Sequence, residues 1–497
     1  MTYVEVQEGG KRSMAILEHL QRGDADAARE TFLAELSSLT FEAKQRDVYR
    51  QHGQGTCEWL LSSDAFQQWF NNEHSSTIWC HGIPGSGKTV LTSIAVNYVS
   101  ANTEGNDVAI VYLYFDYKNR KTHSKLELLS SIARQLSAQC GQIPQLAREF
   151  RDRHADKRKE PEGKDWIVLI RELLRLFRKG YIFIDALDEC PEGSRDDFLQ
   201  DVQQLESSAH LFLTSRIKDV PVPFSKLVLI EISAKESDVR KYLEDKVDSR
   251  SRLRSITASD PSLREEIIAC IANNADGMFL LAHLQLDYLL RYATARQIRG
   301  AMNTLPTDLE GFYSDALLRI KNQGEQDSQT ARKALSFIFC AKRPLTVHEL
   351  CHALAVEDKD HDFDNTGIIP HEVLINISAG LIRLDEQSRI IRLAHHTLQE
   401  YFEKNPDQMP PSPDTRLARA CLTYLSYDIF RTGACSDGEA VKQRLQDYQF
   451  LDYASRHWGS HVKEQSPELI SMALSYLQDK ESQRQCRTSS RVDRAMP

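Results

Sequence analysis

Residues 82–89 of this chain read Gly82-Ile83-Pro84-Gly85-Ser86-Gly87-Lys88-Thr89. This is a full match to the P-loop pattern, in which the glycines let the backbone wrap a phosphate without a Cβ in the way. Successive N–H groups then point inward, and the following helix presents its positive end. Lys88 is expected to reach the β- and γ-phosphates, and Thr89 to offer its hydroxyl to Mg²⁺. We therefore predict that residues 82–89 and the adjoining Val90 bind a nucleotide.

A second run, Tyr181-Ile182-Phe183-Ile184-Asp185-Ala186-Leu187-Asp188-Glu189, joins an apolar strand to acidic residues. A buried strand of this kind delivers a carboxylate to the edge of a sheet, where Asp185 would hold Mg²⁺. Asp188 and Glu189 lie just beyond, placed to orient or deprotonate a water that attacks the γ-phosphate. The alternative is a core strand followed by a solvated acidic turn.

A third apolar run, Leu211-Phe212-Leu213-Thr214-Ser215, ends in Arg216. A guanidinium forks across phosphate oxygens, which makes Arg216 a candidate for contact with the γ-phosphate. An arginine in solvent at the end of a strand is the alternative.

The alternation of strands and helices around these motifs predicts a doubly wound parallel α/β sheet with ligands at the carboxyl ends of its strands. The expected strands are residues 77–80, 108–115, 181–184, 210–214 and 227–232. Thr56 is expected to cap a helix that carries Trp59 to Phe70. Beyond Ile232 the pattern is mostly helical. Thr346 and Glu349 form a capping box ahead of two short apolar runs, an order that suggests a winged helix.

This pattern divides the chain into six predicted parts. They are an N-terminal helical segment (1–54), a nucleotide-binding domain (55–235), a helical domain (236–330), a winged-helix domain (331–404), a second helical domain (412–480) and a disordered tail (481–497).

Composition narrows the class of protein. The net charge of −9 argues against a nucleic-acid partner, which usually requires a strongly basic face. The ten cysteines include no C-x-x-C pair, so we expect reduced thiols in the cytoplasm and no zinc or redox motif. The first residues are mostly polar and do not form a signal peptide, and no apolar run is long enough to span a membrane.

His395 starts the run Ala394-His395-His396-Thr397-Leu398, which has the pattern of a helix start. A histidine at this place can donate to a phosphate oxygen and report which nucleotide is bound. On spacing alone, a structural histidine at a domain junction is the favoured interpretation.

Taken together, the P-loop, residues 184–189 and residues 214–216 resemble the NACHT NTPases of the STAND class of signalling ATPases, which includes the NOD-like receptors. Other stretches are similar to the fungal branch, where the domain often precedes ankyrin or WD-type repeats. They are Gly55-Thr56-Cys57-Glu58-Trp59-Leu60, Gly277-Met278-Phe279-Leu280-Leu281-Ala282, Leu305-Pro306-Thr307-Asp308-Leu309, Arg343-Pro344-Leu345-Thr346 and Phe450-Leu451-Asp452-Tyr453-Ala454. The resemblance covers roughly residues 56–458.

The resemblance implies a switch, in which ADP holds the domains closed and exchange for ATP opens them for oligomerisation. It also implies that His395 is the winged-helix histidine that contacts the ADP β-phosphate. The chain departs from many relatives at Phe279, near a place where they have a proline beside the adenine, and at Ile217, where proline is frequent. We expect no repeat array after Trp458 and no effector before Gly55.

Three functions fit these observations. The leading one is a slow signalling ATPase that binds ATP or ADP with Mg²⁺ and assembles with protein partners or with itself. The second is a non-catalytic scaffold that keeps its nucleotide permanently. The third is an AAA-type motor, which would need an arginine finger that the sequence does not identify. The choice of ATP over GTP comes from the resemblance alone.

Overall fold

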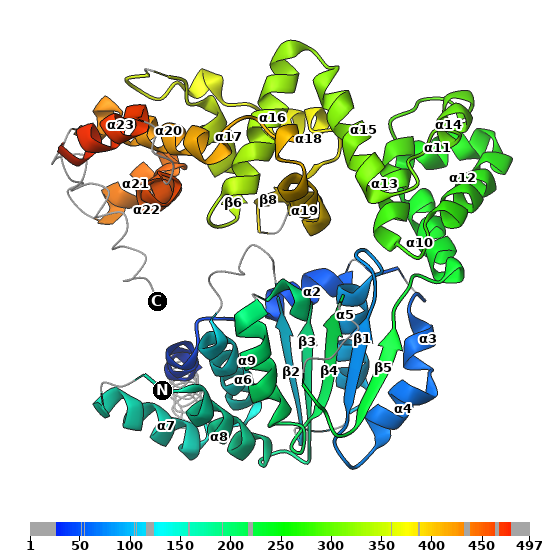
Figure 1. Cartoon of the computed structure of the whole chain (residues 1–497), viewed down its shortest axis with the longest axis vertical. Coiled ribbons are helices and arrows are strands. Elements are labelled where there is room, and N and C mark those ends of the chain that lie inside the picture. Colours follow the sequence, from blue (N-terminus) through cyan, green and yellow to red (C-terminus); the bar gives the residue numbers. More distant parts are fainter. Residues whose placement is uncertain are drawn as a thin grey trace, which may run out of the picture. The chain divides into compact units, whose positions relative to one another are not determined.

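The chain divides into two units, residues 1–302 and residues 303–497 (Figure 1). The structure is a computed structural model that describes residues 26–478, apart from 51, 54, 104, 106, 116–123, 158–159, 191, 217–221, 359, 386–387, 432–437 and 463–466. The predicted tail and the first half of the predicted N-terminal segment lie outside the described residues. The unit boundary falls inside the predicted helical domain 236–330, and the domain boundaries stay a prediction.

The first unit is built on a five-stranded parallel sheet within its described residues, as the sequence predicts. Its strands are β1 (Thr77–His81), β2 (Val108–Tyr114), β3 (Lys179–Asp185), β4 (His210–Ser215) and β5 (Leu227–Glu231). Their order is β2-β3-β4-β1-β5, so the strands that carry the P-loop and the two polar ends are neighbours. Parallel neighbours end on the same edge, which gathers the three motifs there.

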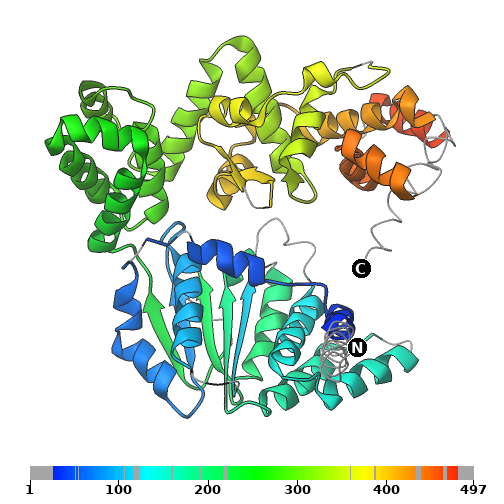
Figure 2. The same cartoon turned by 180° about the vertical axis from the view of Figure 1, so that it is seen from behind.

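Helices cover both faces of this sheet (Figures 1 and 2). Along β3, Ile182 and Ile184 pack into a core shared with α6, α8 and α9, whereas Tyr181 and Phe183 pack into a core shared with α4 and α5. The covering helices are α4 (Asp64–Asn71), α5 (Lys88–Ala101), α6 (Lys125–Gln139), α8 (Gly163–Leu174) and α9 (Glu192–Gln203). Burial on both faces explains why β3 is a continuous apolar run rather than an alternating one.

The β2 edge of the sheet is closed by two side chains of α6. The Gln139 amide donates to Ile110 O (2.8 Å) and its oxygen accepts from Ile110 N (2.9 Å). The Gln135 amide and oxygen make the same pair of bonds to Tyr112 O and Tyr112 N, both at 3.0 Å. Two glutamines one turn apart thus satisfy backbone groups that a further strand would otherwise pair.

The segment before β1 corrects one expectation. Thr56 does not cap a helix. Its hydroxyl donates to Gly53 O at 2.8 Å, and the short helix α3 (Glu58–Leu61) begins after Cys57. A second helix, α4, starts after Ser63, whose hydroxyl accepts from Phe66 N at 3.2 Å. One expected helix is therefore two, because a better capping residue lies inside the run.

Three further helices belong to the first unit. They are a helix over residues 26–36, α2 (Glu42–Arg50) and α7 (Gln145–Lys157), which follows α6.

Five helices complete the first unit after β5. They are α10 (Glu236–Ser249), α11 (Ser251–Ser259), α12 (Pro261–Asn274), α13 (Phe279–Leu289) and α14 (Ala295–Met302).

The second unit contains a small antiparallel sheet with the order β6-β8-β7. The strands are β6 (Leu345–Thr346), β7 (Ile382–Asp385) and β8 (Ile390–Leu393). Thr346 and Glu349 form the expected capping box at the start of α17. The helices of this unit are α15 (Leu309–Lys321), α16 (Glu325–Cys340), α17 (Val347–Ala355), α18 (His371–Ile377), α19 (His396–Lys404), α20 (Pro413–Leu425), α21 (Gly438–Asp447), α22 (Leu451–His461) and α23 (Pro467–Gln478). Among the described helices of the chain, none is both long and apolar enough to cross a membrane.

Candidate nucleotide-binding site

The loop between β1 and α5 needs its glycines for reasons visible in the backbone. Gly85 and Gly87 have φ angles of 79° and 95°, a region that favours glycine. A Cβ on Gly82 would lie 2.1 Å from the carbonyl oxygen of Ile232, so no side chain fits there. Gly87 immediately precedes α5, whose first residue is Lys88. The structure thus places the P-loop at the start of a helix, the arrangement that suits a phosphate.

Lys88 lies among the acids that the sequence predicted for the site. Its Nζ donates to Gly82 O (2.7 Å) and to Ile83 O (2.9 Å). Burial lowers the pKa of Lys88, while Asp188 and Asp185 act in the opposite direction. Glu189 and Arg216 also influence this pKa, the first raising it and the second lowering it. Residues from three separate motifs therefore converge around one ammonium group.

Asp185 is a buried carboxylate at the end of β3, only 1% exposed. Its Oδ1 accepts from Thr214 Oγ1 (2.7 Å) and Thr92 Oγ1 (3.2 Å). Burial raises the pKa of Asp185, and hydrogen bonds from Thr214, Thr89 and Thr92 together with the charge of Lys88 oppose that rise. The two residues predicted to hold Mg²⁺, Thr89 and Asp185, are thus in contact.

The donor set fits a hard divalent cation and a phosphate. Thr89 and Asp185 offer hydroxyl and carboxylate oxygens, the ligand types that Mg²⁺ prefers. The Ser86 hydroxyl is buried with no hydrogen-bond partner among the described residues, although it lies within the loop. A buried hydroxyl without a partner is costly, and a phosphate oxygen in the loop would satisfy it.

Thr92 and Thr214 belong to this site and were not predicted for it. Thr214 also accepts from Ala186 N at 2.9 Å, so one hydroxyl links β4 to the residue after β3. The sequence contained one signal: a polar residue at the end of a strand. This signal points to the site only when β3 and β4 are adjacent, because that pairing brings Thr214 to Asp185.

Arg216 contacts both carboxylate oxygens of Asp188, one through its backbone N–H and the other through its side chain. Arg216 N donates to Asp188 Oδ1 (2.9 Å), and Arg216 Nε lies 2.9 Å from Asp188 Oδ2. The side chains are 21% and 11% exposed, respectively. Asp188 and Glu189 lie in a short 3-10 helix, Leu187–Glu189, that follows the left-handed residue Ala186 (φ 59°). Neither a solvated acidic turn nor an arginine in solvent describes this arrangement.

Helix α13 also contacts the P-loop. Leu280 N donates to Gly85 O at 3.2 Å, and the Phe279 ring lies 3.1 Å from where a Cβ on Gly87 would be. Phe279 packs edge-on against Tyr242, with ring centroids 5.9 Å apart. Phe279 and Leu280 of the stretch 277–282 therefore touch the phosphate loop itself.

Three further predicted residues are Val90, Ile83 and His395. Val90 is half-buried and packs against the core of α4 and α5. Ile83 is 46% exposed. His395 lies in the second unit, where its Nδ1 accepts from Thr397 N at 3.2 Å and caps α19. Contact of His395 with a nucleotide stays a prediction.

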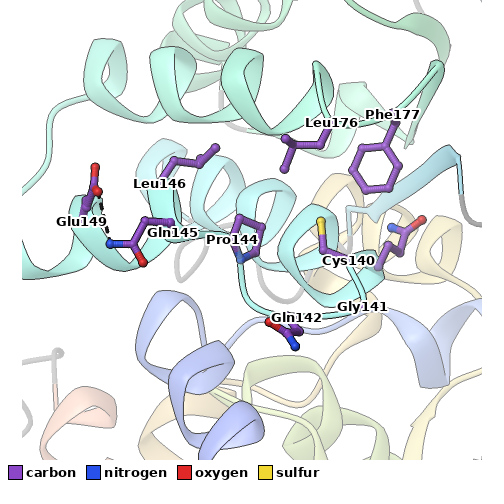
Figure 3. A pocket seen from close by; sticks show the side chains of 10 residues that line it. Cys140, Gly141, Gln142, Pro144, Gln145, Leu146, Glu149, Leu176 and Phe177 are labelled. Carbon is purple, nitrogen blue, oxygen red and sulfur yellow. Dashed lines mark hydrogen bonds between the residues drawn. The ribbon is translucent and has the colours of Figure 1, made fainter.

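A separate pocket of 680 Å³ lies where α6 ends, α7 begins and α8 ends (Figure 3). Its walls include Cys140, Leu146 and Phe177, and it contains none of the predicted site residues. Burial raises the pKa of the Cys140 thiol. The pocket offers no catalytic group to the P-loop.

Comparison with known proteins places families on both units. Residues 55–216 match the family described as nephrocystin 3, N-terminal, and residues 318–410 match the winged-helix domain of GPI inositol-deacylase. The first range contains the P-loop and Arg216, and the second contains the β6-β8-β7 sheet.

A curated relative is the vegetative incompatibility protein HET-E-1 of Podospora anserina, which is 23% identical over 325 residues. The alignment covers 61% of this chain and 23% of that protein, so the chain spans less than a quarter of its relative.

Two solved structures are also similar. One is a STAND protein with a tetratricopeptide repeat sensor from Pyrococcus horikoshii (14% identity, 84% of this chain, 57% of that chain, TM-score 0.40). The other is a Walker-type ATPase of Pyrococcus abyssi (12% identity, 68% and 93% coverage, TM-score 0.32). These TM-scores correspond to a partial likeness only. The P-loop site and the relatives in sequence together support the resemblance of this chain to the fungal NACHT-type P-loop NTPases of the STAND class.

Proposed function

We propose that the chain is a nucleotide-dependent molecular switch in signalling, which binds ATP or ADP with Mg²⁺ and hydrolyses ATP slowly. The observation that carries this proposal is the convergence of Lys88, Asp185, Asp188 and Arg216 at the mouth of the P-loop. A scaffold that only needed a phosphate anchor would require the loop and Lys88, but not a paired arginine and acid beyond it.

Each group has a role that follows from its chemistry. The loop N–H groups and Lys88 bind the phosphates, and Thr89 and Asp185 would hold Mg²⁺, which supplies charge neutralisation when it is bound. Glu189 takes the proton of the attacking water, and Arg216 stabilises charge on the γ-phosphate.

The contact of α13 with the loop supplies a route from nucleotide to domain movement. Phe279 and Leu280 lie against Gly87 and Gly85, so a change in loop conformation must move the start of α13 or lose this contact. We propose that this contact biases a two-state arrangement of domains, with protein partners or further copies of the chain binding the open state in the cytoplasm.

The test is to identify the nucleotide that the purified protein carries, by denaturing it and separating the extract by ion-exchange chromatography. We expect ADP that exchanges for ATP, with an increase in mass by light scattering. Nucleotide that resists excess ATP, with no change in mass, would favour the permanent scaffold instead.

Lys88→Ala is the first variant to compare. It removes charge-assisted hydrogen bonds to phosphate, each worth about 1.5–3 kcal/mol, so affinity should fall by about ten- to a hundredfold or more. Far-UV circular dichroism should stay unchanged because Lys88 acts on the ligand. Lys164→Ala is the matched control, since Lys164 is 76% exposed and pairs with Glu162. Normal ATP binding by Lys88→Ala would contradict the site.

A further inference from the structure

We infer that Asp188 is a positioning residue that acts through Arg216 and is not the acid that activates water, the role proposed above for Glu189. The inference rests on the proposed nucleotide site and assigns different work to two acids that are adjacent in sequence. Its basis is that Arg216 engages both oxygens of Asp188, one through its backbone N–H and the other through Nε, each at 2.9 Å.

This pair fixes the arginine in two ways. The bond from Arg216 N ties the Asp188 carboxylate to the end of β4, and the contact with Nε then sets the plane of the guanidinium. Both side chains are largely covered, at 11% and 21% exposure, so solvent screens the pair less than a surface pair. A guanidinium held at Nε is preorganised, because its plane is fixed before any phosphate binds.

The same pair makes Asp188 a poor candidate for the base. A carboxylate that accepts a proton from water must present an oxygen to that water, and both Asp188 oxygens already accept from Arg216. Glu189 follows at the end of the 3-10 helix and lies close enough to Lys88 to influence its pKa.

The surroundings hold Asp188 in place. The helix that carries it is anchored at its start, because Ala186 N donates to Thr214 Oγ1 (2.9 Å), and closed at its end, because Glu189 N donates to Ala186 O (2.8 Å). Thr214 near the end of β4 and Arg216 just beyond that end therefore hold the turn after β3 at two points. Arg216 also lowers the pKa of Lys88, which shows that the two cations face a common region. A terminal phosphate is the ligand group that two converging cations suit.

The position of Arg216 therefore predicts which nucleotide affinity depends on Asp188. Its loss should weaken binding of a triphosphate more than binding of a diphosphate, because only the triphosphate carries the γ-phosphate that Arg216 would contact. The readout is the ratio of the dissociation constants for ADP and for a non-hydrolysable ATP analogue, both with Mg²⁺.

The experiment is a double-mutant cycle on the full chain with Asp188→Asn, Arg216→Ala and the double variant. We expect each single variant to lower the triphosphate preference by about tenfold, the effect of losing one charge-assisted bond. The double variant should lose no more than Arg216→Ala alone. Glu189→Gln is the comparison: it should keep the preference and slow hydrolysis. Asp188→Ser serves if Asp188→Asn does not fold.

Several outcomes overturn the inference. If the two single effects add in the double variant, Asp188 does not act through Arg216. If Asp188→Asn keeps the triphosphate preference but abolishes hydrolysis, Asp188 is the base. If the wild-type chain binds neither nucleotide, the proposed function itself fails, and this outcome is distinct from the first two.

Discussion

Asp185 is a charged group held in the core of the protein, and it has a thermodynamic consequence. Burial raises its pKa above 3.8. The folded state therefore holds this proton more tightly than the unfolded state, and the stability this provides is complete below pH 3.8 and is lost as pH rises through the folded-state value. At neutral pH the ionised carboxylate destabilises the nucleotide-free protein.

We therefore predict that Asp185→Asn raises the melting temperature of the nucleotide-free protein at pH 7, with a difference that shrinks as pH falls. The reason is that asparagine keeps the shape without the buried charge. The measurement is thermal unfolding in EDTA from pH 5 to pH 8. Asp245→Asn, at an exposed position, is the control and should show no such trend. A melting temperature that Asp185→Asn lowers equally at each pH would contradict the prediction.

Single residues of the site could be predicted where the chemistry is encoded in a short string. Lys88 and Asp185 stand at fixed places in local patterns, and the structure brings them close enough for the charge of each to influence the pKa of the other. Thr92 and Thr214 could not be predicted, because their partner Asp185 lies on another element. The register of β3 against β4, which sets Ile184 opposite Leu213, brings Thr214 beside Asp185.

Elements were predicted best where burial alone determines them. The five strands of the large sheet lie within two residues of their expected bounds. Strands β1 to β4 are largely buried apolar runs, which leave little ambiguity, whereas β5 is an apolar run that stays partly exposed. Helix starts are set by single hydrogen bonds instead. Thr56 has the right side chain for a cap, but its hydroxyl donates to Gly53 O instead. Ser63, which lies inside the single helix that the sequence predicts, is the residue that caps α4.

Three helix ends in the second unit are joined by a hydrogen-bond network. His461, which is fully buried, contacts Asp414 Oδ1 through Nδ1 (2.7 Å) and Tyr453 OH through Nε2 (2.8 Å). Lys342 Nζ donates to the same Asp414 oxygen at 2.8 Å. Cys340 completes a group whose ligand-type atoms lie within 4.8 Å of one another. Because both imidazole nitrogens already have partners, we interpret this group as a link between α16, α20 and α22.

Breaking this link should destabilise the second unit. Burial alone would raise the pKa of Asp414, but hydrogen bonds from His461 and Lys342 together bring it below 3.8. The stability that the ionised Asp414 contributes is present above pH 3.8 and is lost as pH falls through the pKa of Asp414 in the folded state. His461→Ala should cost about 1–3 kcal/mol, since it leaves buried polar groups unpaired. Urea unfolding at pH 7 measures this cost. The exposed variant Glu439→Gln is the control, and equal stabilities would refute the link.

At the scale of the whole molecule, the sequence predicted which kinds of domain follow one another, but not where the chain separates. The unit boundary after Met302 depends on which helices pack together over long distances, and no local pattern marks it. The predicted ranges 236–330 and 331–404 rest on changes in the sequence pattern. Such changes indicate where a new type of element begins, not which helices pack together.

The two units are connected functionally if His395 contacts ADP, and this can be tested. His395→Asn should keep the cap on Thr397 N, because asparagine is a good capping residue, while removing the imidazole. We predict about a tenfold loss of ADP affinity, with ATP affinity little changed. Titration calorimetry with both nucleotides measures this. If His395→Asn binds ADP normally, His395 is only a helix cap.

The closed edge of β2 has a consequence for how copies of this chain can associate. A strand that carries open backbone groups can template the addition of another chain, which is how domain swapping and fibril growth begin. To add a strand at Ile110 and Tyr112, a newcomer would have to displace four hydrogen bonds made by Gln135 and Gln139. The two amides therefore protect this side of the sheet from the addition of a strand by another copy of the chain.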